Sequence, residues 1–319
     1  MVSSRDFIYL AVSTMLILNS SSSVTATQNV TLSLLATLDI KADLVKVDEH
    51  YAYVAADNVL QIIDLSDRRK PSVTGVINTP GRIWSLHVDT PYIYVAGGLE
   101  GLHIIEFSDA AHPTLIGTHT TPGQALAVST TGTVAMVINL MTGLELVDIT
   151  DKTNPTLLFT QETPGYQWGI EGSGPHVYII DQPSGLHLFD VSNPNAPVAI
   201  GLYETDEPAN DIIFGAGNRG YLTYARSRAI DILDVSDPSN LRRVGRYEAT
   251  ARFQHIAISE FNLMVPAGDG GLSVIDVSNS SQPTLRLSYD TPGTVQDIAV
   301  DNNLVAIADK EALILLHLE

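Results

Sequence analysis

The stretch Gly101-Leu-His-Ile-Ile-Glu-Phe-Ser-Asp109 recurs in related form along the sequence. Each copy has an apolar run, an acidic residue, another apolar residue, Ser or Thr, and then Asp or Asn. The copies are Leu60–Asp67, Leu144–Asp151, Leu186–Asn193, Ile230–Asp237 and Leu272–Asn279, with a substituted version at Leu313–Glu319. The acidic residue stands at positions 64, 106, 148, 190, 234 and 276, so the spacing is 42 or 44 residues. Periods near 40 residues indicate stacked supersecondary units, and a four-stranded blade needs about that length.

The unit at residues 113–154 shows how one repeat is built. Four β-rich apolar runs alternate with clusters of Gly, Pro, Ser, Thr and Asn, which predicts a four-stranded antiparallel meander. No stretch of the chain keeps an apolar period of 3.6 residues, so we expect helices to be nearly absent. The fourth run is apolar at nearly every position, as expected for a sheet that is packed on both faces.

Seven such units can be counted. They start at Val30, Pro71, Pro113, Pro155, Pro197, Leu241 and Pro283. The first unit begins with an outer strand, Thr31–Thr37, and the last unit ends without one. We therefore predict an all-β, seven-bladed β-propeller of four-stranded antiparallel blades, in which the N-terminal strand completes the last blade and closes the ring. Closure removes an exposed sheet edge.

The most repeated acidic residue has a structural explanation. Asp64, Asp148 and their equivalents end a strand, where a short carboxylate accepts hydrogen bonds from backbone N–H groups of a turn. We interpret them as turn residues and not as catalytic ones. The recurrent proline that follows cannot donate to a β-ladder, so it predicts that the next strand lies at the outer edge of its blade.

The repeat resembles the LVIVD family of bacterial and archaeal surface proteins. The signature is clearest at Gly185–Pro197 and Gly271–Pro283, and the resemblance covers Val30–Glu319. It implies a β-propeller on an extracytoplasmic protein. It implies no reaction and no family-wide site. The departures, Glu106 for the repeated acid and Leu241 for the proline, do not affect the fold expected.

Composition and the N-terminal segment give further expectations. The 319 residues include 36 acidic and 17 basic ones, for a net charge of −19, and no cysteine. Nucleic acid is not an expected partner, because phosphate binding needs clusters of Lys and Arg. Residues 7–18 are apolar and uncharged, and small residues near Ala26 follow, which predicts a signal peptide at 1–26 and a propeller domain at 27–319. We expect a monomer outside the cytoplasm (secreted, periplasmic or on the cell surface), not inserted in the membrane after cleavage; an uncleaved anchor is the alternative.

Candidate binding residues gather where the inner strands begin. In a propeller these strands line a central channel, and the loops at this end form the usual ligand surface. Aligning the units places Asp43, Ser85, Ala127, Gly169, Asp211, His255 and Asp297 at one shared position. The residues before or near it include Trp84, Trp168, Tyr166, Arg82, Arg252, Phe253, Gln254 and Gln296. Aromatic faces and amides suit a peptide or a sugar. Filling of the space between blades by these tryptophans is the alternative.

Two functions follow from this arrangement. One is a non-enzymatic binding or scaffolding module for a protein, peptide or glycan, without a cofactor. The other is an enzyme at the channel mouth, a hydrolase or lyase that is possible only by analogy with other propellers. Asp43, Asp211, His255 and Asp297 could supply oxygen and nitrogen ligands to a divalent cation, although no compact calcium loop is present. A purely structural component of a surface layer is a third reading.

Overall fold

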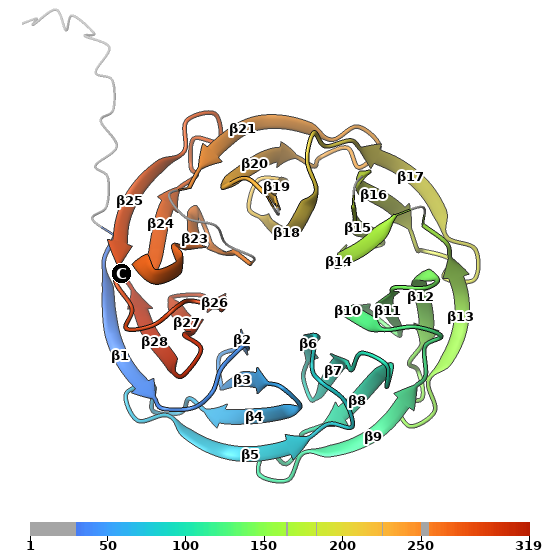
Figure 1. Ribbon diagram of the computed structural model, residues 1–319, viewed down its shortest axis with the longest axis horizontal. Coiled ribbons are helices and arrows are strands. Elements are labelled where there is room, and N and C mark those ends of the chain that lie inside the picture. The colour runs from blue at the N-terminus through green and yellow to red at the C-terminus, as the bar shows by residue number, and fades with distance from the viewer. Residues whose placement is uncertain (1–29, 164, 183, 225, 250–254) are drawn as a thin grey trace, which may run out of the picture.

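The computed structural model describes residues 30–163, 165–182, 184–224, 226–249 and 255–319. In this part of the chain the strands form seven four-stranded antiparallel sheets, arranged as a ring around a central opening (Figure 1). The predicted seven-bladed β-propeller is therefore confirmed. We number the blades from the N-terminus, so that blade 1 is β2–β5 and blade 7 contains β26–β28 and β1.

Each blade has four strands, numbered here from the channel outward. The inner strands are β2 (Leu44–Val47), β6 (Ser85–Asp89), β10 (Ala125–Thr131), β14 (Tyr166–Ser173), β18 (Ala209–Gly215), β22 (Ala257–Ser259) and β26 (Asp297–Asp301). The second strands are β3 (Tyr51–Ala56), β7 (Tyr92–Ala96), β11 (Val134–Asn139), β15 (His176–Gln182), β19 (Arg219–Tyr224), β23 (Asn262–Pro266) and β27 (Leu304–Ala308).

The repeated motif forms the third strand of every blade. These strands are β4 (Val59–Asp64), β8 (Leu102–Glu106), β12 (Gly143–Asp148), β16 (Gly185–Asp190), β20 (Ala229–Asp234), β24 (Leu272–Asp276) and β28 (Leu313–Leu318). The outer strands are β5 (Ser72–Asn78), β9 (Thr114–His119), β13 (Thr156–Gln161), β17 (Val198–Tyr203), β21 (Arg242–Glu248), β25 (Thr284–Tyr289) and β1 (Leu32–Leu38). Of the described residues, only Gly268–Gly270 form a helix, a single 3-10 turn, and none forms a helix long and apolar enough to cross a membrane.

The ring closes through the two ends of the described chain. Strand β1 pairs antiparallel with β28, from Leu32 opposite Leu318 to Leu38 opposite Leu313. Reciprocal hydrogen bonds between Thr31 and Glu319 extend this pairing by one step. Figure 1 shows β1 in blue beside β28 in red. The N-terminal strand thus supplies the outer strand of blade 7, as the unit count predicts.

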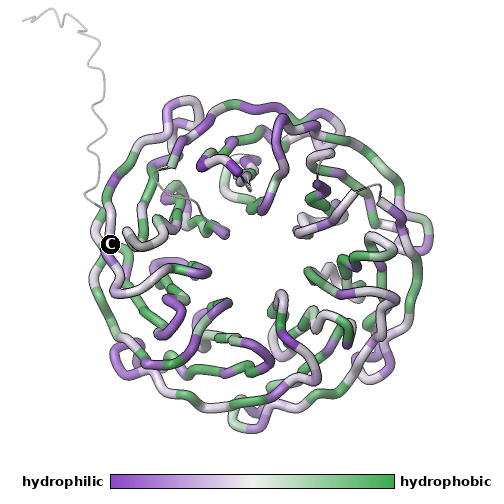
Figure 2. Tube along the Cα trace, viewed as in Figure 1, coloured by the Kyte–Doolittle hydropathy of each residue, from purple (hydrophilic) through white to green (hydrophobic). Residues whose placement is uncertain are grey.

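The core lies between the blades. Each hydrophobic cluster of the described residues joins two neighbouring sheets; one of them packs Ile63 of blade 1 against Leu315 of blade 7. Third strands are buried on both faces, and Leu144, Leu146 and Val147 of β12 are fully buried. Figure 2 shows hydrophobic residues along the strands and hydrophilic residues in many of the loops. Burial on both faces explains why the repeated motif is apolar at almost every position.

The repeated acidic residues form turns, as predicted. Oδ1 of Asp64 accepts a hydrogen bond from the Ser66 amide at 2.7 Å, and Oδ1 of Asp148 accepts one from the Thr150 amide at 2.8 Å. The hydrogen bond from the Ser66 backbone holds the pKa of Asp64 below its ordinary value. These carboxylates are therefore engaged in local structure, on the side of the ring where the third strand turns toward the outer strand.

Glycines in the outer strands let neighbouring blades approach closely. A Cβ atom at Gly245 of β21 would lie 1.7 Å from the Ser280 carbonyl oxygen, in the turn after the third strand of blade 6. Gly75 meets the Ala110 carbonyl of the next blade in the same way. The glycine is thus required by contact between blades, because no side chain fits between the outer strand and the neighbouring turn.

Candidate functional site

The central opening holds a cavity of about 570 Å³ that is lined by residues of all seven blades. We call the end at which the inner strands begin the channel mouth. Asp43, Trp84, Leu126, Trp168, Asp211, His255 and Asp297 lie there, one from each blade in order. The sequence alignment therefore identified residues that the fold brings to one cavity.

Short loops hold these residues in place. Each loop joins the outer strand of one blade to the inner strand of the next. Thr79 Oγ1 donates to the Gly81 carbonyl at 2.7 Å, and Thr121 Oγ1 donates to the Gly123 carbonyl at 2.7 Å. A hydroxyl that bonds its own backbone two residues on stabilises a tight turn. The loops that present the mouth residues are therefore fixed by the local sequence.

Blades 2 to 4 give the mouth an aromatic side. Trp84 and Trp168 line the cavity and are 40% and 51% exposed, with Leu126 of blade 3 between their blades. The Arg82 guanidinium lies over the Trp84 ring, 5.2 Å from its centroid. Tyr166, two residues before Trp168 on β14, is 72% exposed. The tryptophans are therefore only partly buried between blades, and the exposed parts of the two side chains line the mouth.

This apolar surface continues onto the hairpins between the second and third strands. Leu99 is 71% exposed in the β7–β8 hairpin, and Met141 is 74% exposed in the β11–β12 hairpin. Both hairpins touch the mouth: Gly98 pairs with Ala125, and the Leu140 amide donates to the Gln124 carbonyl.

Gly98 lies against the indole of Trp84, since a Cβ atom at Gly98 would be 2.9 Å from Trp84 Nε1. Leu99 is the next residue in the chain. We call the following set the apolar arc: Trp84, Leu99, Leu126, Met141, Tyr166 and Trp168.

The opposite side of the mouth is polar and acidic. It contains Asp211, His255, Asp297 and Asp43 from blades 5, 6, 7 and 1, which we call the acidic arc. His255 Nδ1 lies 3.4 Å from Asp211 Oδ2. Burial in the channel opposes a charged imidazole, but the contact with Asp211 and the charge of Asp297 outweigh it and raise the pKa of His255. Asp297 also joins blades 7 and 1, because its Oδ2 accepts a hydrogen bond from the Val45 amide at 2.9 Å.

The structure corrects the alignment of Asp43. The sequence comparison placed it level with Ser85, but Leu44 is the residue that pairs with Ala55 as Ser85 pairs with Ala96. The Asp43 amide donates to Ala55 just as the Trp84 amide donates to Ala96. Asp43 therefore occupies the tryptophan position of blade 1. The register between the first two strands decides this, and the spacing of the repeat does not reveal it.

The other candidate residues have different outcomes. Gln296 lines the cavity, and its Nε2 donates to the Thr294 carbonyl at 3.3 Å. Arg252, Phe253 and Gln254 lie outside the described residues. Among the residues that the structure describes, no three His, Asp or Glu side chains are placed to hold a metal ion. A divalent cation bound by Asp43, Asp211, His255 and Asp297 stays a prediction.

Deeper in the channel lie three titratable residues that the sequence comparison did not single out. Lys46, His87 and Glu171 line the cavity from blades 1, 2 and 4. Burial raises the pKa of Glu171 to about 7, with Asp211 adding to the rise and Lys46 opposing it. Burial also lowers the pKa of His87 to about 4, helped by Lys46. His87 and Glu171 stand two residues after Ser85 and Gly169, on the same side of an alternating strand, so the strand period could have identified them. Lys46 stands two residues after Leu44, the position that only the structure shows to be equivalent to Ser85.

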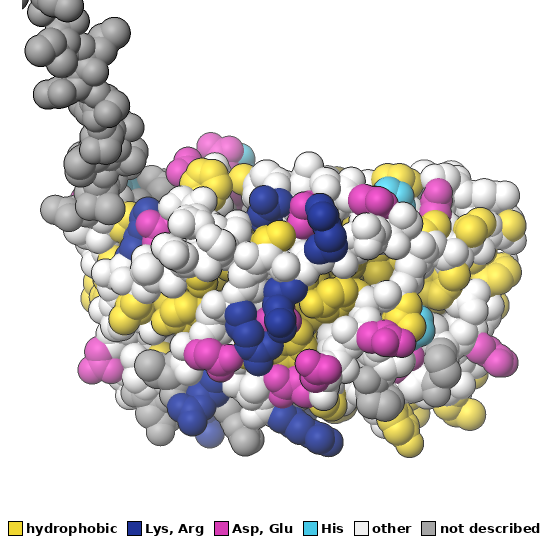
Figure 3. Space-filling view, turned by 90° about the horizontal axis from the view of Figure 1, so that it is seen from above, with side chains coloured by type: hydrophobic (Ala, Val, Ile, Leu, Met, Phe, Trp, Pro, Cys, Tyr) yellow, Lys and Arg dark blue, Asp and Glu magenta, His cyan; other side chains and the backbone are white. Residues whose placement is uncertain are grey.

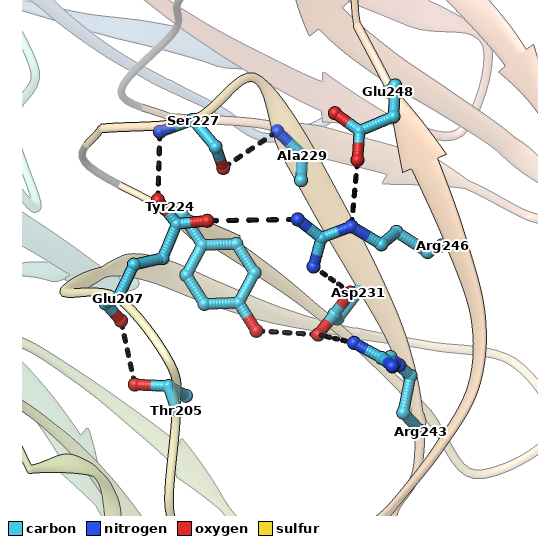
Figure 4. Close-up of polar contacts among 9 residues, drawn as sticks. All are labelled: Thr205, Glu207, Tyr224, Ser227, Ala229, Asp231, Arg243, Arg246 and Glu248. Carbon is cyan, nitrogen blue, oxygen red and sulfur yellow. Dashed lines mark hydrogen bonds and ion pairs between the residues drawn. The ribbon is translucent and has the colours of Figure 1, made fainter.

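A separate polar cluster lies away from the channel, among β19, β20 and β21 (Figure 4). Asp231 is buried and accepts hydrogen bonds from the Tyr224 hydroxyl at 2.6 Å and from Arg246 Nη1 at 3.0 Å. Arg246 also bonds Glu248 at 2.8 Å. Figure 3 shows Lys and Arg side chains gathered on this side of the ring together with acidic ones. Since the arginines are paired with carboxylates, we interpret the cluster as structural.

Comparison with protein-family models gives two matches. A beta propeller domain model matches residues 41–185, and the LVIVD repeat model matches residues 221–249 and 253–291. The chain is a β-propeller with LVIVD repeats in its second half. The LVIVD match at 221–291 thus confirms the expected resemblance, and the propeller match at 41–185 is consistent with it.

Solved structures similar to this LVIVD-repeat propeller share its fold at low sequence identity. The Cps50 (Swd1) propeller domain of Myceliophteria thermophila is 12% identical with a TM-score of 0.76, and the match covers 90% of this chain and 99% of that one. A chain of a mitotic checkpoint complex is 14% identical with a TM-score of 0.73, covering 98% and 99%. The RRP9 WD40 repeats are 8% identical with a TM-score of 0.73, covering 90% and 97%. No curated protein matches the LVIVD-repeat propeller.

Proposed function

We propose that this protein is a non-enzymatic binding module that takes a protein, peptide or glycan ligand at the channel mouth. One observation carries the proposal. The only two tryptophans of the chain both line the mouth, and both are partly exposed beside a cavity. Large aromatic side chains next to a concave site, with a few polar groups around them, are typical of ligand recognition.

The proposal places this activity outside the cytoplasm. The apolar run at 7–18 and the small residues before position 27 support export, although residues 1–26 lie outside the described structure. A monomer without a cofactor is sufficient for this role. The fold is shared with a chain of the mitotic checkpoint complex, a protein assembly, which supports a binding role in general terms only.

Tryptophan fluorescence tests this proposal directly. Because Trp84 and Trp168 are the only tryptophans, a ligand that occupies the mouth should shift or quench the emission of the whole protein. We would screen short peptides and oligosaccharides against the full chain and measure affinities by calorimetry. A variant with Trp84→Ala and Trp168→Ala should lose most of the affinity, whereas the outer-strand control Val73→Ala should keep it. A ligand that binds the double variant as tightly as the unmodified protein would place the site elsewhere.

A further inference from the structure

The two arcs of the channel mouth differ in chemistry, and the difference specifies the ligand. Blades 2 to 4 contribute aromatic, aliphatic and small residues at the start of the inner strands. Blades 5, 6, 7 and 1 contribute carboxylates, amides and an imidazole. No single blade shows this division. It appears only when the seven positions are read around the ring.

The acidic arc favours a cation. The acidic residues that line the cavity are Asp43, Glu171, Asp211 and Asp297, and the basic ones are Lys46 and Arg82. Glu171 has a pKa of about 7 and is partly protonated at neutral pH, so Asp43, Asp211 and Asp297 supply most of the negative charge. Arg82 lies on the other side, over Trp84. Asp211 lies 3.4 Å from His255 Nδ1, and within the described part of the chain no Lys or Arg forms an ion pair with Asp43 or Asp211. Carboxylates in a confined cavity attract a cation more strongly than carboxylates in bulk water do.

The apolar arc favours a segment of chain over a small molecule. Leu99, Met141 and Tyr166 are each more than 70% exposed and lie outside the cavity, on hairpins and a strand of three successive blades. Exposed apolar side chains that lie together mark an interaction site. A sugar can stack on the tryptophans, but it has no group that matches Leu99 and Met141 or that neutralises the carboxylates.

We propose, on the basis of the binding function above, that the ligand is a peptide segment of a partner protein. Its apolar side chains pack on the apolar arc, and a Lys or Arg side chain enters the mouth toward Asp43 and Asp211. The geometry requires only that a basic residue stands near an apolar one in the segment. The aromatic rings beside the carboxylates contribute as well, since a tryptophan face attracts an ammonium or guanidinium group.

The test is a selection followed by matched variants. A display library of short random peptides is selected for binding to the full chain. The bound peptides are eluted and identified, and those that change the tryptophan emission of the protein are kept. We expect enriched sequences that combine Lys or Arg with Leu, Phe, Tyr or Trp. Replacing the basic residues of a selected peptide by Glu, or its apolar residues by Ser, should each weaken binding about tenfold or more, and its affinity should fall as salt is added.

Variants of the protein separate the two arcs. Asp43→Asn with Asp211→Asn, and Leu99→Ser with Met141→Ser, should each weaken binding of the selected peptide about tenfold. The controls Glu260→Gln and Phe261→Ser remove an exposed charge and an exposed apolar group from the β22–β23 hairpin at the opposite face, and should change affinity less than about twofold.

Two results would overturn the proposal. If acidic peptides or neutral oligosaccharides bind at the mouth and the basic, apolar peptides do not, the ligand class is wrong and the binding function stands. If no selected peptide and no oligosaccharide depends on Trp84 and Trp168, both the ligand class and the binding function are wrong. Circular dichroism of each variant confirms that the fold is kept.

Discussion

Glu171 is a carboxyl group whose burial in the channel should cost stability at neutral pH. Its pKa in the folded protein is about 7, against an ordinary value of 4.5. Between pH 4.5 and pH 7, the folded state therefore holds a proton on Glu171 that the unfolded chain has already lost. Stability falls as the pH rises through this window and then becomes constant. The difference between the two values corresponds to about 3 kcal/mol.

The substitution Glu171→Gln removes this proton linkage and keeps the shape of the side chain. We expect the free energy of unfolding of the variant to match that of the unmodified protein near pH 4.5, and to exceed it by about 3 kcal/mol at pH 8. Urea denaturation at several pH values, followed by circular dichroism, measures the difference. The exposed Glu162→Gln variant is the matched control and should follow the unmodified protein throughout.

A constant difference between Glu171→Gln and the unmodified protein across this pH range would refute the reasoning. It would mean that water in the channel solvates the carboxylate well enough to leave its pKa ordinary. A larger stability of the variant at high pH would have a functional meaning as well. Residues that lower stability and yet occupy a cavity are typical of binding sites, where function and stability compete.

Three further predictions concern other residues. His87→Gln should raise the free energy of unfolding at pH 5 by about 2 kcal/mol and leave it unchanged at pH 8. Burial lowers the pKa of His87 to about 4, so the unfolded chain takes up a proton at pH 5 that the folded protein does not, and the same urea series measures the difference. Gly245→Ala should destabilise the ring by about 1–3 kcal/mol, since the added methyl group meets the Ser280 carbonyl; a thermal melt with an unchanged midpoint would contradict it. Tyr224→Phe should cost about 1.5–3 kcal/mol, because it removes a hydrogen bond to a buried carboxylate. Asp231→Ala should cost more, because it removes the shared partner of Tyr224, Arg243 and Arg246, although Arg246 keeps Glu248; equal losses would show that the charges do not matter.

The repeat made most of the fold predictable. A fixed spacing, four runs in each unit and an unpaired outer strand at the start are sufficient to derive seven blades and a closed ring. The turn role of Asp64 followed from its place at the end of a strand, and the hydrogen bond to Ser66 confirms it. These features are local or periodic, so the sequence contains them directly.

The site was only partly predictable. The two tryptophans share a repeat position, and the structure places both at the cavity. The register of Asp43 depends on how β2 pairs with β3, which the spacing does not encode. The contrast between the two arcs and the burial of Glu171 depend on which blades stand around the channel. They become visible only in the closed ring.

The pairing of β1 with β28 also determines the order in which the molecule can assemble. A chain that is made from its N-terminus must hold β1 without its partner while six blades form, because Leu318 pairs with Leu32. Bringing together residues so far apart in sequence is entropically costly and slow. Blade 7 is therefore completed last, and this step joins the first described strand to the last. Opening any blade afterwards first requires the neighbouring contacts to break, so we expect the closed ring to unfold slowly and as a whole.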